Sequence, residues 1–203
     1  AFNEPGTQLV DTDGQGVERI TETALVANGL EYEVDCIIYA SGFEVGSTYT
    51  SRAGFDLVGR DGQTLSACWR DGMRTLHGNQ VHGFPNAFIV QPSQAANLIS
   101  NVPHNIVDHA NTISAIVSHT EKNGFSEVEP TDTAQDAWVD LVLSGSGMMI
   151  GSPDCTPGYY NNEGKGLTEL NKYAVGHPGG PRAYFAHISA WRQSGEFEGV
   201  EFR

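Results

Sequence analysis

Short runs of apolar residues separated by turn residues fill the first part of the chain. Residues 17–21 and 24–27 are strand-like, and residues 31–35 alternate polar and apolar side chains. Asn28-Gly29 lies between the second and third of these runs and is typical of a two-residue hairpin turn. The pattern therefore predicts short strands with a tight turn at Asn28.

Two further apolar runs end in small or polar residues. Residues 36–40 are continuously apolar, which is typical of a strand buried on both faces of a parallel sheet, and Ser41-Gly42 end the run. Residues 87–90 predict another short strand, which stops at Gln91. In doubly wound sheets ligands bind at the carboxyl ends of strands, so these ends are candidates for a cofactor-facing edge. The pattern alone fits a purely structural pair of strands equally well.

Helical periodicity begins near residue 100. Residues 103–119 predict an amphipathic helix, with Pro103 suited to its first turn and Asn123-Gly124 to its end. The apolar positions of its 3.6-residue repeat are Ile106, Ala110, Ile113 and Val117.

A shorter helix is predicted over residues 131–143, capped by Thr131 or Asp132. Residues 144–182 are rich in glycine, proline and asparagine and predict a long loop, which in a compact domain is usually functional. Residues 183–192 predict a last strand or helix.

Composition excludes several classes of protein. The 203 residues are 39% hydrophobic and 18% charged, which argues against a disordered chain and against a membrane protein. A net charge of −14 repels phosphate backbones and anionic lipids, so neither nucleic acid nor a membrane is an expected partner. The three cysteines form no C-x-x-C pair and no targeting segment is visible, so we expect a protein of the reducing cytoplasm.

Common catalytic motifs are missing or incomplete. Gly14-Gln15-Gly16 lacks the third glycine of a dinucleotide fingerprint and lies between strand-like runs. Gly145-Ser146-Gly147 lacks the spacing of a nucleophile elbow. The seven histidines form no H-E-x-x-H, so no metal site is predicted. These patterns assign no catalytic residue.

Four motifs in order resemble those of one enzyme family. Residues 35–43, DCIIYASGF, are similar to the D-x-[IV]-[IV]-x-A-T-G-F strand of flavin-containing monooxygenases, with Ser41 in place of threonine. Residues 83–88, GFPNAF, resemble the G-F-P-N-L-F strand of Baeyer–Villiger monooxygenases. The turn at residues 59–62 precedes this strand and Ser100-Asn101 follow it, as in the family. The chain therefore resembles the C-terminal third of a Baeyer–Villiger monooxygenase.

The resemblance implies an α/β fold that is part of a flavoprotein with two Rossmann-like dinucleotide-binding domains. Residues 1–42 would form the end of the NADPH-binding domain and its return strand. Residues 43–203 would form the C-terminal half of the FAD-binding domain and a helical, loop-rich region near substrate and cofactor. The family's glycine-rich fingerprints and active-site arginine are absent from this sequence, and the chain begins at Ala1, so we expect an incomplete enzyme that is inactive alone.

The resemblance also implies a reaction and a site. FAD, reduced by NADPH, would use O2 to insert an oxygen atom beside the carbonyl of a ketone, giving an ester or lactone. Backbone N–H groups at the start of the long helix would stabilise negative charge on the flavin. Leu98 and Ile99 would face the substrate. The residues implied to contact a cofactor are Ser41, Gly42, Gln91, Asn97, Ser100, Asn101, Val102 and Tyr160.

Two other functions remain open. A flavin monooxygenase that oxidises nitrogen or sulfur, or hydroxylates diamines, would share the motif at residues 35–43. A free-standing α/β binding module without catalytic function is the second, and a bound flavin would separate it from the enzymes. Strands that lack their partners expose edges, so without the missing N-terminal portion we predict dimerisation or aggregation.

Overall fold

The computed structural model describes residues 3–42, 48–91, 93–145, 158, 164 and 173–203. The chain divides into two compact units, Ala1–Gly42 and Phe43–Arg203. The domain assignment that the family resemblance implies for residues 1–42 and 43–203 stays a prediction. None of the described helices is long and apolar enough to cross a membrane.

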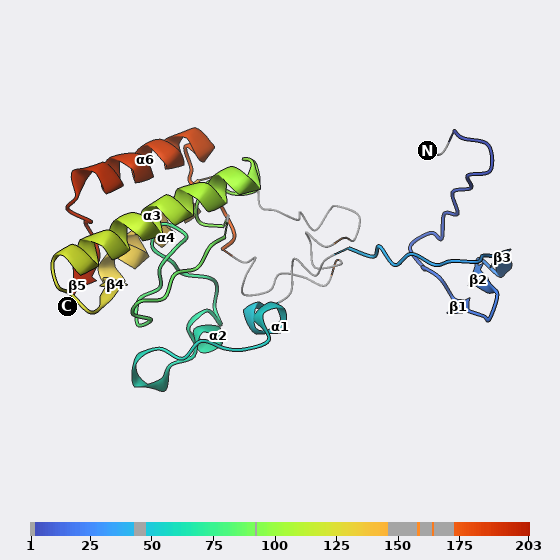
Figure 1. The fold of residues 1–203 in the computed structure, drawn as a ribbon, viewed down its shortest axis with the longest axis horizontal. Coiled ribbons are helices and arrows are strands. Elements are labelled where there is room, and N and C mark those ends of the chain that lie inside the picture. The colour runs from blue at the N-terminus through green and yellow to red at the C-terminus, as the bar shows by residue number, and fades with distance from the viewer. Residues whose placement is uncertain (1–2, 43–47, 92, 146–157, 159–163, 165–172) are drawn as a thin grey trace. The chain divides into compact units, whose positions relative to one another are not determined.

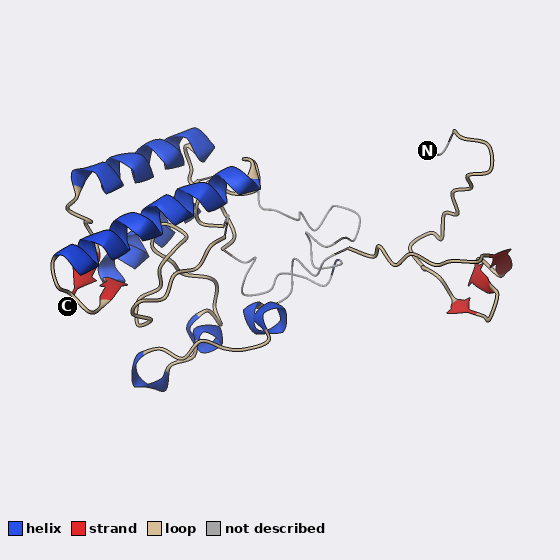
Figure 2. Ribbon diagram, viewed as in Figure 1, coloured by secondary structure: helices blue, strands red, loops and turns tan. Residues whose placement is uncertain are grey.

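The first unit contains a three-stranded antiparallel sheet (Figure 2). Its strands are β1 (Arg19–Ile20), β2 (Ala24–Ala27) and β3 (Leu30–Glu33), in the order β1-β2-β3. Asn28 and Gly29 join β2 to β3 with φ angles of 54° and 71°. A two-residue turn with positive φ at both positions matches the twist of the flanking strands, and asparagine and glycine tolerate it best. The predicted hairpin is confirmed.

The buried strand predicted over residues 36–40 is wrong for this structure. These residues form no strand, and Ile38 and Tyr39 are 86% and 77% exposed. A strand requires a neighbour that accepts and donates backbone hydrogen bonds, and none of the described strands pairs with this segment. Ser41 and Gly42, which follow it, are also exposed.

Helices dominate the second unit (Figures 1 and 2). The only sheet among its described residues pairs β4 with β5 in antiparallel register. Its elements in chain order are α1 (Tyr49–Ala53), η1 (Arg60–Gly62), α2 (Leu65–Cys68), α3 (Val102–Lys122), β4 (Val128–Pro130), α4 (Asp132–Leu143), α6 (Gly180–Ser194) and β5 (Val200–Phe202).

The strand predicted at residues 87–90 is also wrong, because these residues pair with none of the described strands in a ladder. The Ile89 N–H donates to the Asn79 carbonyl at 2.7 Å, and the preceding Asn86 N–H donates to the Val128 carbonyl at 2.9 Å. Residues 87–91 therefore form an irregular segment. The chain is mixed α/β, and its described strands pair only in antiparallel fashion.

Both predicted helices form. The long one is α3, which the Asn101 side chain caps by accepting from the His104 N–H at 3.4 Å, and Gly124 follows its end with φ 73°. The shorter one is α4, capped by Thr131. The last predicted element is the helix α6.

The apolar stripe used to predict α3 does not lie against the core. Ile106 is 49% exposed, Ala110 and Val117 are exposed as well, and Ile113 is half-buried. The face that is buried is mostly polar and consists of Asn105, Asp108, His109, Thr112 and Ile116. The predicted helix is confirmed, but the face predicted to pack against the core is wrong, because buried hydrogen bonds orient α3.

Three apolar clusters hold the second unit together. One packs Leu76 against Trp138 of α4 and Ile188 of α6, a second surrounds Trp69, and a third surrounds Ile116 of α3. Burial of aromatic and aliphatic side chains of this size contributes about 1.5–3 kcal/mol each. The clusters fix the loops that precede α3 against α4 and α6.

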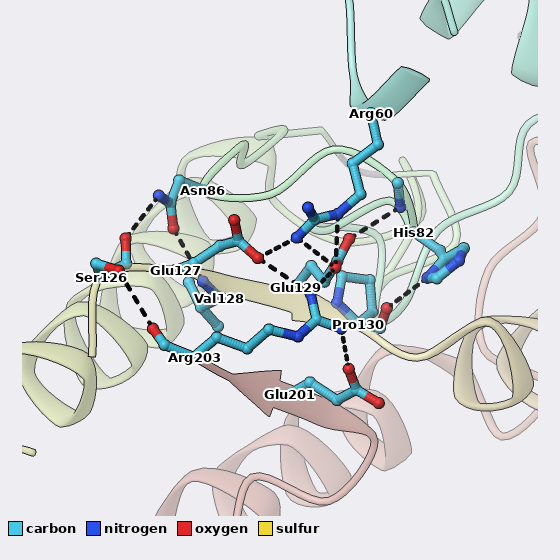
Figure 3. Close-up of polar contacts among 11 residues, drawn as sticks. Arg60, His82, Asn86, Ser126, Glu127, Val128, Glu129, Pro130, Glu201 and Arg203 are labelled. Carbon is cyan, nitrogen blue, oxygen red and sulfur yellow. Dashed lines mark hydrogen bonds and ion pairs between the residues drawn. The ribbon is translucent and has the colours of Figure 1, made fainter. Parts of the chain in front are cut away.

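An ionic network joins β4, β5 and the turn at η1 (Figure 3). Glu129, whose side chain is 3% exposed, accepts from Arg60 Nε at 3.0 Å and from Arg203 Nη1 at 2.5 Å. The Gly83 N–H donates to its other oxygen at 3.2 Å. Arg60 also pairs with Glu127. Through its bonds with Arg60, Gly83 and Arg203, the buried carboxylate of Glu129 connects β4 to three segments that are distant in sequence.

Candidate functional site

A hollow of about 560 Å³ opens at the N-terminal end of α3. It contains two of the residues predicted to contact the flavin, Ser100 and Asn101. The rest of its wall comes from the first two turns of α3 and from α6, through Pro103, His104, Val107 and Phe185.

The loop of residues 93–97, which leads to this hollow, is held from several sides. Gln94 is fully buried; its Nε2 donates to the Met73 carbonyl at 2.7 Å, and its Oε1 accepts from Thr75 at 2.6 Å. Its own N–H donates to the Val175 carbonyl at 2.7 Å. Gln94 and Asn97 have φ angles of 55° and 62°, a conformation that costs side chains other than glycine free energy and persists only where neighbours fix it.

A second set of hydrogen bonds ties the loop to α3. Asn105 is 1% exposed and donates from Nδ2 to the Asn97 carbonyl at 3.2 Å, while its Oδ1 accepts from Ser100 Oγ at 3.2 Å. The Leu98 N–H donates to Asn97 Oδ1 at 2.7 Å. Asn105 therefore positions residues 97–100 over the first turn of the helix.

One backbone N–H at the start of α3 has no acceptor among the described residues. His104 N–H is bound by the Asn101 cap, Asn105 N–H donates to the Asn101 carbonyl at 3.2 Å, and Pro103 has no N–H. Among the described residues no acceptor binds the Val102 N–H. This group and the positive end of the helix dipole favour an electron-rich oxygen at this place.

Buried polar contacts place α6 beside α3 (Figure 1). Arg192 of α6 pairs with Asp108 at 2.8 Å and donates to Thr112 Oγ1 at 2.7 Å. At the other end of the two helices the His104 and Phe185 rings meet edge to face with centroids 4.5 Å apart. Phe185 thus reaches a hollow that begins more than eighty positions earlier in the sequence.

His104 lines the hollow, and a second histidine of α3 lies outside it. His109 is buried on α3, and its Nδ1 lies 3.1 Å from Asn79 Nδ2. Burial lowers the pKa of His109, so the ring is neutral near pH 7. Within the part of the chain that the structure describes, no three His, Cys, Asp or Glu side chains gather closely enough to hold a metal ion.

The structure gathers some of the predicted site residues and separates others. Asn97, Ser100, Asn101 and Val102 lie together at the start of α3, with Leu98 half-buried and Ile99 59% exposed beside them.

The remaining predicted residues lie elsewhere. Gln91 donates to the Met73 sulfur at 2.9 Å. Ser41 and Gly42 belong to the other compact unit, and Tyr160 lies outside the described residues. These predicted contacts stay untested.

Sequence patterns missed Asn105, His104 and Phe185. A signal for Asn105 was available, since Asn101, Asn105, Asp108 and Thr112 recur at helical spacing and mark a polar face. No local signal connects Phe185 with the start of α3, because that contact depends on how two helices pack.

Comparison with known proteins places this geometry in context. No protein-family model matches the chain. An FAD-binding monooxygenase of Hypomyces subiculosus is 42% identical over 201 residues, which make up 98% of this chain and 33% of that protein. Pentalenolactone D synthase of Streptomyces arenae is 43% identical over 207 residues, or 100% of this chain and 34% of the synthase. A Baeyer–Villiger monooxygenase of Stachybotrys chlorohalonatus is 37% identical over 98% of this chain and 32% of its own length.

The chain is homologous to Baeyer–Villiger monooxygenases over about a third of their length. The likeness extends to the fold, since the polycyclic ketone monooxygenase of Thermothelomyces thermophila matches 100% of this chain and 33% of its own with a TM-score of 0.82 and 29% identity. A steroid monooxygenase bound to NADP matches with a TM-score of 0.74 and 23% identity, over 99% of this chain and 36% of its own. The Baeyer–Villiger resemblance inferred from residues 35–43 and 83–88 is confirmed.

Proposed function

We propose that the protein takes part in an FAD- and NADPH-dependent Baeyer–Villiger oxidation of a ketone, and that this chain supplies one wall of the flavin and substrate site. The hollow at the start of α3 carries the proposal, because Ser100 and Asn101 line it and the next residue, Val102, has a backbone N–H without an acceptor among the described residues. Homology over the whole chain to monooxygenases of this type supports it.

The residues present fit one edge of a flavin. The Val102 N–H and the dipole of α3 would hold a carbonyl oxygen of the ring, and Ser100 and Asn101 would lie beside it. FAD, when bound, supplies the redox chemistry of O2 activation with electrons from NADPH. Leu98 and Ile99 would face the ketone and exclude water from it.

The domain assignment belongs to the same proposal. Residues 1–42 would end the NADPH-binding domain, with Ser41 and Gly42 near a cofactor, and residues 43–203 would complete the FAD-binding domain of a two-dinucleotide Rossmann-like fold. The chain spans about a third of its relatives, so the proposed enzyme needs further polypeptide for the glycine-rich fingerprints absent here. Residence in the cytoplasm remains a prediction.

An FAD fluorescence titration of this chain together with the further polypeptide that the proposed enzyme needs tests the proposal. Ser100→Ala removes the hydroxyl that bonds to Asn105 and Asn97 and should weaken FAD binding about tenfold, the worth of one or two hydrogen bonds. Ser118→Ala, an exposed change on α3 away from the hollow, is the control and should leave FAD affinity unchanged. Absence of FAD binding, or equal losses in both variants, would overturn the proposed site.

Product analysis separates the competing reactions. With NADPH, O2 and a cyclic ketone, the proposed activity yields a lactone heavier by one oxygen atom, which mass spectrometry detects. Turnover of an amine or sulfide without turnover of any ketone would favour the nitrogen- or sulfur-oxidising alternative.

A further inference from the structure

A second cavity, of about 260 Å³, lies between α4, α6 and the segment that precedes Gly78. Its lining includes the buried side chains of Leu76, His77, Trp138 and Trp191, and its open side is lined by exposed residues, namely Ala137, Leu141, His187 and Glu198. A cavity of roughly 150 Å³ is enough to hold a benzene molecule. The space is therefore large enough for one substituted aromatic ring.

His77 is the unusual group in this lining. It is only 7% exposed, yet neither ring nitrogen has a hydrogen-bond partner among the described residues. Its backbone is fixed, since its φ is 56° and its carbonyl accepts from the Tyr184 hydroxyl at 3.1 Å. The ring nitrogens are not among the buried side-chain atoms that lack a partner, so solvent reaches the ring from the cavity, and the donor of a ligand can take the place of that water.

The surrounding rings define the shape of the ligand. The His77 ring meets Trp138 and Trp191 edge to face, with centroids 4.6 Å and 4.9 Å away. The indole N–H groups are already used, because Trp138 donates to the Gln94 carbonyl at 2.9 Å and Trp191 to the Glu198 carbonyl at 2.9 Å. The indoles thus offer only ring surface to a ligand, and aromatic rings pack best on such surface.

The charges of the lining residues limit the kind of ligand that the cavity can bind. Burial lowers the pKa of His77 to about 3, with a smaller contribution from His187, so the imidazole is neutral near pH 7 and can accept a hydrogen bond. The one acidic side chain in the lining is Glu198, and it disfavours anions.

We propose that this cavity binds a neutral aromatic molecule with one O–H or N–H donor, of the phenol or indole class, and that His77 accepts the hydrogen bond. The site is separate from the hollow at α3 and its occupation does not require FAD. Trp138 connects the two places, since the carbonyl that it holds belongs to the loop before Asn97.

Phenol and benzene are the probes that test the hydrogen bond. In an NMR titration of protein labelled with ¹⁵N-histidine, phenol should shift the ring signals of His77 and bind about tenfold more tightly than benzene. For a molecule of this size a dissociation constant on the order of 1 mM is expected. Equal affinity for phenol and benzene, or no binding of either, would overturn the proposal.

Two substitutions locate the binding. Ala137→Leu adds bulk to a residue of the lining and should weaken phenol binding at least about tenfold, whereas Thr133→Leu, exposed on the same helix outside the cavity, should not. His77→Asn keeps a residue that tolerates positive φ and should abolish the preference for phenol over benzene. Persistence of that preference in His77→Asn would show that another group binds the donor.

Discussion

Replacement of Glu129 by glutamine should destabilise the second unit substantially. The Glu129 side chain is 3% exposed and accepts hydrogen bonds from Arg60, Arg203 and the Gly83 N–H (Figure 3). A hydrogen bond to a charged group contributes about 1.5–3 kcal/mol, and an amide retains one acceptor while turning a donor toward an arginine. Both arginines are 41–50% exposed and can be rehydrated, which reduces the loss. We expect the free energy of unfolding to fall by about 2–3 kcal/mol.

Urea unfolding followed by tryptophan fluorescence measures this loss. With a slope of about 2 kcal/mol per molar urea, the Glu129→Gln midpoint should fall by about 1 M. Glu201→Gln is the matched control, because the Glu201–Arg203 pair is half exposed on both sides and should change stability by less than about 0.5 kcal/mol. Equal midpoints for the two variants would refute the view that burial makes the Glu129 contacts strong.

The pH dependence of the same comparison provides a sign test. Burial alone would raise the pKa of Glu129, but the hydrogen bonds from Arg60 and Arg203 outweigh it and hold the pKa below its ordinary value of 4.5. A carboxylate with a lowered pKa in the folded state stabilises above its unfolded pKa and loses that contribution as the pH falls through the folded value. The difference between wild type and Glu129→Gln should therefore shrink below pH 4.5.

Three further outcomes are expected. The pKa of His77 falls from 6.5 to about 3 on folding, so the free energy of unfolding should decrease as the pH drops between these values, by at most about 1.4 kcal/mol per pH unit. Urea titrations at several pH values measure this slope, and His77→Asn should flatten it. Gly199→Ala should lower the free energy of unfolding by about 3 kcal/mol, since φ is 83° and a Cβ would lie 2.5 Å from a side chain of α4. Gly195→Ala, where φ is 71° and the space is open, should lower it by about 1 kcal/mol, and calorimetry measures both losses. Asn105→Ala should cost about 2 kcal/mol and loosen the loop before α3, as amide hydrogen exchange would show, while exposed Asn111→Ala should change stability by less than about 0.5 kcal/mol.

Local chemistry made the hairpin and the helices predictable. Asn28-Gly29 specifies a turn by backbone conformation alone, and the Thr131 and Asn101 caps satisfy N–H groups within their own first turns. The strands expected at residues 36–40 and 87–90 failed because a strand depends on partners distant in sequence. Apolar composition is necessary for a buried strand but does not supply those partners.

The sequence led to the loop residues of the candidate site but not to the side chain that α6 contributes to it. Family resemblance led to Asn97, Ser100, Asn101 and Val102, which do lie together at the start of α3. Phe185 joins them only because Arg192 and Asp108 hold α6 against α3, and nothing near either residue in the sequence indicates that pairing. Side chains brought in by helix packing are invisible to a search along the chain.

The orientation of α3 follows from the free energy of its polar side chains. Exposing Ile106 and Val107 loses some hydrophobic stabilisation, but turning them inward would expose Asn105 and Asp108 and break their contacts with Ser100, Asn97 and Arg192. Several buried hydrogen bonds and an ion pair shielded from water depend on this one face. The same rotation places Asn105 where it bonds to Ser100 and Asn97, so the arrangement that breaks the amphipathic rule also holds the residues of the proposed flavin edge.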